Sequence, residues 1–290
     1  LTGYTAKNRT EIFAMKVAPI QVNYLGYTST MGGDCMNYLI ADKTIIPEKN
    51  KKYYSEKIVY LPNSYMANVS KVKTSEKLFT RQDVGLPAEG FVFCSFNYHY
   101  KITPTTFAGW MRILKAVDGS VLWLRESSTE SVDNLKKEAM KNGIDESRLI
   151  FAPRLDLNED HLSRQKLADL FLDTLPYNAH ITTSDALRMG VPVLTCIGKA
   201  FSGRVAASLL KAVNLPEMIT TTQEEYERLA IELATNPEKI KTIKKKLANN
   251  LPTAPLYDTP LFTKNLEAAY QVMYEKYQND LNFDDIEIKN

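Results

Sequence analysis

The sequence predicts an α/β fold built on a Rossmann-like parallel sheet flanked by helices. From residue 91 onward, short apolar runs alternate with amphipathic stretches of helical length. This alternation is typical of a parallel sheet covered by helices on both faces. The composition, 44% apolar and 24% charged residues over 290 positions, is that of an ordinary globular protein with one large or two medium domains.

We divide the chain into three segments: residues 1–88, a partial first lobe with a linker; residues 89–254, a Rossmann-like lobe; and residues 255–290, a C-terminal helix with a tail. In the first segment, strands are expected at residues 20–25, 38–42 and 57–62. The run Gly32-Gly33-Asp34 is expected to open a short helix before the second strand. Residues 63–90 are polar and rich in lysine, which indicates a solvated crossing.

The second segment carries the regular alternation. Strands are expected at residues 91–96, 120–124, 148–151, 170–173 and 191–195. Helices are expected at residues 104–116, 130–141, 158–166, 184–189, 204–212, 222–234 and 237–249. Pro104 is a start signal, and Asn142-Gly143 is a stop signal. In the third segment, apolar periodicity predicts a helix at residues 263–277, and we expect the acidic residues 280–290 to be a frayed tail.

Charge and cysteine content exclude several classes of protein. A net charge of +2 gives no global field for nucleic acid or an anionic membrane, so neither is expected as a partner. No apolar run approaches the ~20 residues of a membrane helix, and the N-terminus does not resemble a signal peptide. Cys35, Cys94 and Cys196 are far apart and form no C-x-x-C pair. These features predict a cytoplasmic protein with free thiols.

The absence of common motifs narrows the chemistry. The sequence contains no G-x-G-x-x-G, no G-x-x-x-x-G-K-[ST] and no G-x-S-x-G, which disfavours NAD enzymes, P-loop NTPases and α/β-hydrolases. The histidines, His99, His161 and His180, lack i, i+4 spacing and an obvious carboxylate partner. We therefore expect neither a metal site nor a cofactor.

Lys101, just past the first strand of the Rossmann-like lobe, and Thr182-Thr183, near an expected helix start, could instead neutralise an anionic ligand such as a diphosphate. Taken alone, Lys101 is more often a surface lysine, and Asp185 more often a first-turn carboxylate. His180 is the least easily explained by structure, because a turn followed by His-x-Thr-Thr aims several donors in one direction.

An ordered series of motifs extends over nearly the whole chain. The motifs are Gly3-Tyr4-Thr5, Ala18-Pro19-Ile20-Gln21, Leu25-Gly26-Tyr27, Ser95-Phe96-Asn97, Tyr100-Lys101-Ile102, His161-x-x-Arg164, Leu172-Asp173-Thr174, Asn178-Ala179-His180-x-Thr182-Thr183-x-Asp185 and Arg204-Val205-Ala206. In this order they resemble the catalytic region of the O-linked N-acetylglucosamine transferases, a superfamily that includes the plant SPINDLY proteins.

The resemblance implies a GT-B fold, of which this chain would hold the C-terminal lobe and the last part of the N-terminal lobe. It implies an inverting, metal-independent transfer of N-acetylglucosamine or a related sugar from a UDP-sugar to serine or threonine of a protein. The partners would be a UDP-sugar and a protein or peptide acceptor. The family's tetratricopeptide repeats, with a period of ~34 residues, are not visible, so we expect further sequence before Leu1. The alternative is a non-catalytic nucleotide-sugar-binding or interaction domain.

Matched positions imply roles for individual residues. Lys101 would be the catalytic residue, holding the diphosphate and stabilising the leaving UDP. The remaining residues would bind the donor: His180, the Ile181 backbone and Thr182 the phosphates, Asp185 the ribose, His161 the uracil, Arg164 the nucleoside and Gly26 the sugar. Tyr98 stands where many members have glutamine, Ile181 where threonine is usual, and Asn158 where the animal enzymes have lysine. We expect the missing threonine hydroxyl and the missing cation to weaken contacts with the phosphates or the ribose. The pairing of His180 with Asp185 favours a UDP-sugar over GDP-fucose.

Overall fold

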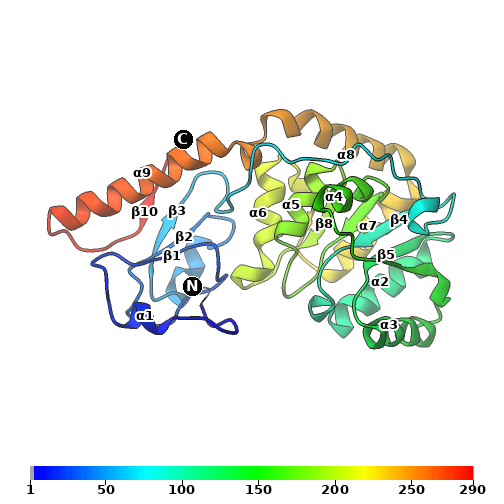
Figure 1. Cartoon of the computed structure of the whole chain (residues 1–290), viewed down its shortest axis with the longest axis horizontal. Helices are drawn as coiled ribbons and strands as arrows, with labels where there is room; N and C mark the ends of the chain where they lie inside the picture. The colour runs from blue at the N-terminus through cyan, green and yellow to red at the C-terminus, as the bar shows by residue number, and fades with distance from the viewer. Residues whose placement is uncertain (1–2, 290) are drawn as a thin grey trace.

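The computed structural model describes residues 3–289, which form two parallel β-sheets with helices packed around them (Figure 1). The smaller sheet has the strand order β1-β2-β3-β10, and the larger has the order β6-β5-β4-β7-β8-β9. The predicted α/β fold with a parallel sheet flanked by helices is confirmed.

The element bounds are as follows. The strands are β1 (Val22–Asn23), β2 (Tyr38–Ala41), β3 (Lys57–Tyr60), β4 (Val92–Ser95), β5 (Val121–Arg125), β6 (Leu149–Ala152), β7 (Leu170–Leu172), β8 (Val193–Cys196), β9 (Ile219–Thr220) and β10 (Ile286–Glu287). The α-helices are α1 (Glu11–Ala14), α2 (Pro104–Ala116), α3 (Thr129–Lys141), α4 (Asn158–Gln165), α5 (Ile181–Arg188), α6 (Val205–Ala212), α7 (Gln223–Thr235), α8 (Pro237–Asn250) and α9 (Thr259–Gln278).

The larger sheet forms from consecutive apolar residues because both of its faces are covered. All four residues of β4 and of β8 are buried. The chain runs from β4 outward through β5 to β6, and then returns to place β7 on the other side of β4. The strand order therefore reverses between β4 and β7, and in such sheets a ligand binds outside the carboxyl ends of the strands at this point.

Local signals set most helix ends. Thr103 accepts a hydrogen bond from the Thr106 backbone N–H, and Pro104 is the first residue of α2, as predicted. Two expected helix starts are wrong by three or more residues. The helix α5 begins at Ile181, not at residue 184, so the two threonines lie in its first turn, and α9 begins at Thr259, not at residue 263.

The expected short helix after Gly32 is also wrong, because Gln21 holds this segment in an irregular conformation. The Gln21 carbonyl accepts from the backbone N–H of Asn37 (2.8 Å), and its side-chain amide donates to the Cys35 carbonyl (2.5 Å).

The C-terminal tail is part of the smaller sheet, which corrects the expectation of a frayed end. Strand β10 pairs in parallel with β3, and the Ile288 N–H donates to the Tyr60 carbonyl (3.0 Å). Ile286 and Ile288 are buried against Val59 and Met273, the latter from α9. The two buried isoleucines, together with the Asp285 carboxyl, which accepts from the Ile58 N–H (2.7 Å), anchor the tail. The helix α9 returns the chain to its N-terminal half (Figure 1).

The two sheets are joined by a continuous apolar core and a buried polar junction. Leu39 and Ile58 of the smaller sheet belong to the same buried cluster as Phe93 of the larger. At the junction, the buried Asp42 accepts from the Ser208 hydroxyl (2.6 Å) and from the Tyr65 backbone N–H (3.0 Å). The two lobes are therefore packed against each other.

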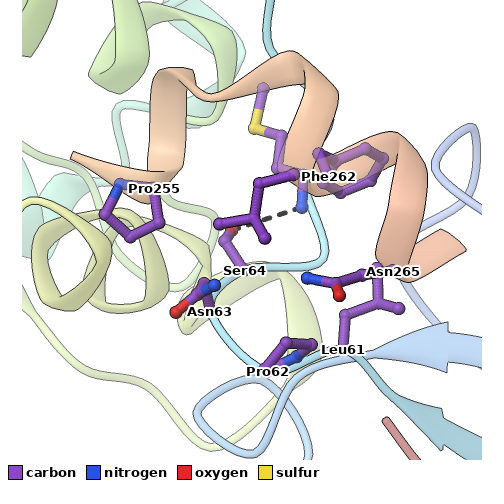
Figure 2. A pocket seen from close by; sticks show the side chains of 9 residues that line it. Leu61, Pro62, Asn63, Ser64, Pro255, Phe262 and Asn265 are labelled. Atoms are coloured by element: carbon purple, nitrogen blue, oxygen red, sulfur yellow. Dashed lines mark hydrogen bonds between the residues drawn. The ribbon is translucent and has the colours of Figure 1, made fainter. Parts of the chain in front are cut away.

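A small pocket lies where the chain leaves β3 and passes the start of α9 (Figure 2). It is lined by residues that include Leu61, Pro62, Phe262 and Asn265, and its volume of about 10 Å³ is at most that of one water molecule. No larger ligand can bind there.

Within residues 3–289, no helix combines the length and the apolar character that a membrane span requires. Cys35, Cys94 and Cys196 are free thiols, as predicted, and the last two are buried.

Candidate functional site

The ends of β4 and β7 are tied together by a chain of side-chain hydrogen bonds. Asn97, just past β4, donates through Nδ2 to the hydroxyl of Thr174, just past β7 (3.0 Å). The Thr182 hydroxyl, in the first turn of α5, donates to Oδ1 of Asn97 (2.9 Å). The point at which the strand order reverses therefore carries a fixed polar frame.

Asp173 shapes the loop that follows β7. Its buried carboxyl accepts from the backbone N–H groups of Thr174 (2.8 Å) and Ala179 (2.6 Å) and from the Thr195 hydroxyl (2.6 Å). Burial raises the pKa of Asp173 to about 7, opposed by these hydrogen bonds and by the positive charge of Lys101. Asp173 thus holds residues 174–179 in one conformation beneath the site.

Lys101 and His180 meet at the same aromatic ring. The Lys101 Nζ donates to the Asn178 carbonyl (2.8 Å) and lies 4.1 Å from the centroid of the Tyr177 ring. The His180 imidazole stacks on Tyr177, with ring centroids 4.8 Å apart, and its Nε2 donates to the Ser202 carbonyl (3.2 Å). The structure thus brings the lysine and the histidine together around one ring, while their roles stay predictions.

Burial sets the charge state of this pair. It lowers the pKa of Lys101 to about 8, partly offset by the charge of Asp173. It also lowers the pKa of His180 to about 4, with a further contribution from Lys101. Lys101 is therefore largely protonated at neutral pH, whereas His180 is neutral and can donate a hydrogen bond without carrying charge.

A pocket of about 340 Å³ lies next to this pair, outside the ends of β4, β5 and β6. It is lined by Phe96, Tyr98, Arg125, Pro153, Arg154, Leu155, Asp156, Asn158, His161, Arg164 and Thr182. The structure thus brings together five of the predicted site residues: Tyr98, Asn158, His161, Arg164 and Thr182. Its size is in the range of ligand-binding pockets.

His161 and Arg164 form the inner end of this pocket. The His161 ring meets Phe96 edge-on, and its Nδ1 accepts from Nη2 of Arg164 (3.0 Å). Burial, followed by the charges of Arg164 and Arg125, lowers the pKa of His161 to about 4, so the ring is neutral. A neutral imidazole beside an aromatic ring is suited to packing on a planar base.

Arg164 is only 2% exposed, yet no carboxylate in the described part of the chain lies within ion-pair distance of it. Its Nε has no hydrogen-bond partner among residues 3–289. Buried arginines are almost always paired, and an unsatisfied buried donor is costly. The guanidinium therefore brings to the pocket a charge that no carboxylate among residues 3–289 neutralises, while its Nε is itself shielded from solvent.

The remaining predicted residues lie at or beyond the rim of the pocket. Ile181 is 67% exposed at the start of α5, and no side chain caps this helix. Asp185 is half-buried in α5, where burial raises its pKa to about 6 and the charge of Arg188 opposes the shift. Gly26 is exposed in the loop after β1. Neither Asp185 nor Gly26 lines the pocket.

Sequence reasoning missed several residues of this site. Asn97 and Asp173 form its frame, and Arg125 adds a cation whose guanidinium lies 3.9 Å from the centroid of the Tyr98 ring. Asn97 and Asp173 directly follow strands and stand in the quoted motifs, a signal that could have indicated them. Among residues 3–289, no group of three or more His, Cys, Asp or Glu side chains is placed to hold a metal ion.

The sequence matches a protein-family model, described as glycosyl transferase family 41, over residues 1–71 and 66–266. The chain belongs to glycosyl transferase family 41. The expected resemblance to the O-linked N-acetylglucosamine transferases, and thus to a family of glycosyltransferases, is confirmed.

Curated relatives agree with this family. The chain is 37% identical over 98% of its length to a probable UDP-N-acetylglucosamine–peptide N-acetylglucosaminyltransferase SEC from Arabidopsis thaliana, of which it covers 31%. It is 34% identical over 96% of its length to the corresponding SPINDLY protein of Petunia hybrida, of which it covers 30%. The chain thus spans less than a third of these family 41 relatives.

Solved structures confirm an α/β Rossmann-like fold that this chain shares with GT-B glycosyltransferases. A mutant O-GlcNAc transferase of Thermobaculum terrenum matches with a TM-score of 0.80 and 30% identity, over 91% of this chain and 50% of that one. HepE of Anabaena, solved with UDP and glucose, matches with a TM-score of 0.55 and 17% identity, over 82% of this chain and 64% of that one. The second likeness shows a shared fold alone.

Proposed function

We propose that this chain is the donor-binding and catalytic region of an inverting, metal-independent glycosyltransferase. It would transfer N-acetylglucosamine or a related sugar from a UDP-sugar to serine or threonine of a protein. The observation that carries the proposal is Lys101, a desolvated amine held by the neutral carbonyl of Asn178 beside His180. A lysine arranged in this way is free to neutralise an anion that enters the site.

Three groups converge where the diphosphate would lie. Lys101 supplies a positive charge, and His180 supplies a neutral imidazole. The first turn of α5 adds uncapped backbone N–H groups at Ile181 and Thr182, which favour a phosphate at this helix end. These fixed donors support a mechanism in which the protein itself, rather than a metal ion, neutralises the leaving group.

The neighbouring pocket would hold the nucleoside. The neutral ring of His161 would pack on uracil, and the guanidinium of Arg164, which lines the same pocket, would donate to the base or the ribose. Tyr98 and Asn158, on the wall of the same pocket, would complete the contacts of the nucleotide. Asp185, whose carboxyl is half-buried on α5, would bind the ribose, and Gly26 would approach the sugar from the other lobe.

The reaction is then a direct displacement. The acceptor hydroxyl attacks the anomeric carbon from the face opposite the diphosphate and loses its proton to the solvent. The bond to the phosphate oxygen breaks as the new bond forms, and UDP leaves with the electron pair. Lys101 would stabilise the negative charge that develops on the leaving oxygen. We place the reaction in the cytoplasm, because the three cysteines are free thiols.

Titration calorimetry with UDP tests donor binding. We expect a Kd in roughly the micromolar range, weaker by about tenfold or more in Lys101→Ala because a charge-assisted contact is lost. Lys115→Ala, an exposed lysine on α2, is the matched control and should bind as the wild type does. Unchanged binding by Lys101→Ala would overturn the assignment, and a loss of binding in EDTA that Mg²⁺ restores would overturn metal independence.

A second measurement separates the enzyme from a mere binding domain. NMR of a serine peptide incubated with the UDP-sugar should show a glycoside whose anomeric configuration is opposite to that of the donor. Retained configuration would contradict the inverting mechanism. Tight UDP binding with no transfer to any serine or threonine peptide would instead favour a non-catalytic nucleotide-sugar-binding domain.

A further inference from the structure

A second cleft, of about 720 Å³, lies between the two lobes and shares no residue with the donor pocket. One wall comes from the smaller lobe, and the other comes from the connection between β8 and α6. The lining residues are Ser29, Thr30, Lys49, Asn50, Lys52, Tyr53, Tyr54, Gly198, Lys199, Ala200, Phe201 and Arg204. A cleft of this size, lined by residues of both lobes, is large enough for several residues of an extended polypeptide.

The lining of this cleft carries positive charge without negative charge. Lys49, Lys52 and Lys199 are exposed and have no ion-pair partner among residues 3–289. Arg204 donates through Nε to the Thr44 carbonyl (2.7 Å) and through Nη1 to the Gly198 carbonyl (2.9 Å), and the buried Asp42 offsets its charge only in part. No aspartate or glutamate lines the cleft. Two buried carboxylates lie behind the lining: Glu56, which accepts from the Thr30 hydroxyl, and Asp42. Because four cations face the cleft against these two, the local field is positive, although the whole chain has a net charge of only +2.

The cleft and the donor site share one wall. The turn Phe201–Gly203 contributes Phe201 to the cleft, while the carbonyl of Ser202 binds the His180 imidazole on the other side. The turn is held firmly, because a Cβ added to Gly203 would lie 2.7 Å from the Pro176 carbonyl oxygen. Only the turn Phe201–Gly203 thus separates a molecule bound in the cleft from His180, which would hold the phosphates.

We infer that this cleft binds the acceptor polypeptide and selects segments in which aspartate or glutamate flanks the modified serine or threonine. The inference rests on the proposed function, since it names the substrate class of that enzyme. Lysines that belong to two separate elements match carboxylates spaced along an extended chain. The hydroxyl of such a segment would lie beside the turn that separates the cleft from the donor.

A polypeptide fits this cleft better than a single-stranded nucleic acid does. Binding of nucleic acid uses stacking on several exposed aromatic rings and a basic groove that follows the backbone. Here Tyr53 is 67% exposed, but Tyr54 is half-buried and Phe201 is buried. The positive charge is confined to one short cleft, which suits a few carboxylates.

Fluorescence anisotropy with a matched pair of labelled peptides tests the inference. One peptide carries aspartate and glutamate around a central serine, and the other carries asparagine and glutamine at the same positions. We expect the acidic peptide to bind about tenfold more tightly at low salt, and this advantage to disappear near 1 M salt, at which the Debye length is about 3 Å. Equal affinity for the two peptides at low salt would overturn the inference.

Charge reversal localises the effect. In the double variant Lys52→Glu and Lys199→Glu, we expect the preference for the acidic peptide to fall by about tenfold. The matched control is Lys137→Glu on α3, which lies at the far end of the larger lobe (Figure 1) and should keep the preference. Neutral Lys52→Gln and Lys199→Gln should give an intermediate loss. An undiminished preference in the double variant would contradict the assignment of this cleft.

Calorimetry with UDP on the same proteins separates the two proposals. The double variant should bind UDP as the wild type does, because none of its changed residues lines the donor pocket. If the wild type fails to bind UDP but still discriminates the peptides, the donor proposal fails and the cleft remains an acidic-peptide site. If a single-stranded RNA binds more tightly than the acidic peptide and displaces it, the polypeptide assignment is wrong.

Discussion

Two groups of cations, in different parts of the molecule, differ in their exposure to solvent. At the ends of β4 and β7, Lys101 and Arg164 are desolvated, and both contact neutral acceptors instead of carboxylates. In the cleft between the lobes, Lys49, Lys52 and Lys199 are exposed. The first group lies on a rigid polar frame, whereas the second lies on the tips of long flexible side chains.

If both groups bind anions, as we propose, they do so in two different ways. Burying a charge without a counterion costs free energy, which is recovered only when an anion enters and takes the place of water. Such a site discriminates by position and hydrogen-bond geometry. Exposed lysines cost little, act over about a Debye length and discriminate mainly by charge. The predictions below test this contrast, beginning with the frame of the buried site.

Removing the carboxyl of Asp173 should have the largest effect. Asp173→Ala leaves the buried N–H groups of Thr174 and Ala179 without their acceptor, and each unsatisfied group costs about 1–3 kcal/mol. We expect urea denaturation to show a free energy of unfolding lower by about 3 kcal/mol. Asp173→Asn keeps one acceptor oxygen and should lose about half as much. A loss in the alanine variant no larger than that of a typical surface substitution would show that the frame does not depend on this carboxyl.

Replacing Arg164 should lower the affinity for UDP without lowering the free energy of unfolding. Arg164→Met keeps much of the side-chain volume but removes a buried charge that lacks a carboxylate partner. We expect UDP affinity to fall by about tenfold, while the free energy of unfolding stays the same or rises by about 1 kcal/mol. Arg228→Met, at an exposed position on α7, is the control and should change neither quantity. A marked loss of stability in Arg164→Met would mean that the guanidinium serves the fold rather than a ligand.

The lowered pKa of Lys101 makes donor binding dependent on pH. The amine is protonated below its pKa of about 8 and loses its proton above it. Since a diphosphate binds the charged form, UDP affinity should be constant just below pH 8 and should fall by about tenfold per pH unit well above it. Lys101→Arg stays charged throughout this range, so its affinity, although altered, should not fall with pH. Calorimetry at a series of pH values gives both curves, and parallel curves would exclude Lys101 as the titrating group.

The larger sheet could be predicted from the sequence because its signals are local. Apolar runs and cap residues such as Pro104 act within a few positions of the element that they define. Strand β10 could not be predicted, because two residues carry no periodicity and the strand exists only by pairing with β3. The start of α5 was placed too late because the β-branched run from Ile181 to Thr183 disfavours a helix locally, and tertiary packing overrides this preference.

In the candidate site, too, some residues could be identified from sequence motifs, whereas others depend on contacts between distant parts of the chain. The resemblance supplied positions such as Lys101 and His161. The structure places Lys101 in the turn that follows β4, and His161 on α4, where it lines the pocket. The resemblance could not show which residues form the polar frame of the site. Asp173 and Asn97 act through partners on other strands and helices, so their importance depends on which strands lie side by side. The basic cleft was missed for the same reason, since Lys52 and Lys199 are far apart in the sequence.

The smallest predicted effect concerns Ile181, where the family usually has threonine. Its side chain is 67% exposed at the first position of α5, so it contributes little to packing. Ile181→Thr would add a hydroxyl beside the uncapped N–H groups that we assign to the phosphates. We expect UDP to bind about threefold more tightly, in line with about 0.5–1 kcal/mol for one net hydrogen bond. Ile181→Val, which is β-branched but has no hydroxyl, is the control and should bind as the wild type does. If the threonine and valine variants bind UDP equally, the phosphates do not approach this end of α5, and the buried cations must hold the donor without help from the helix.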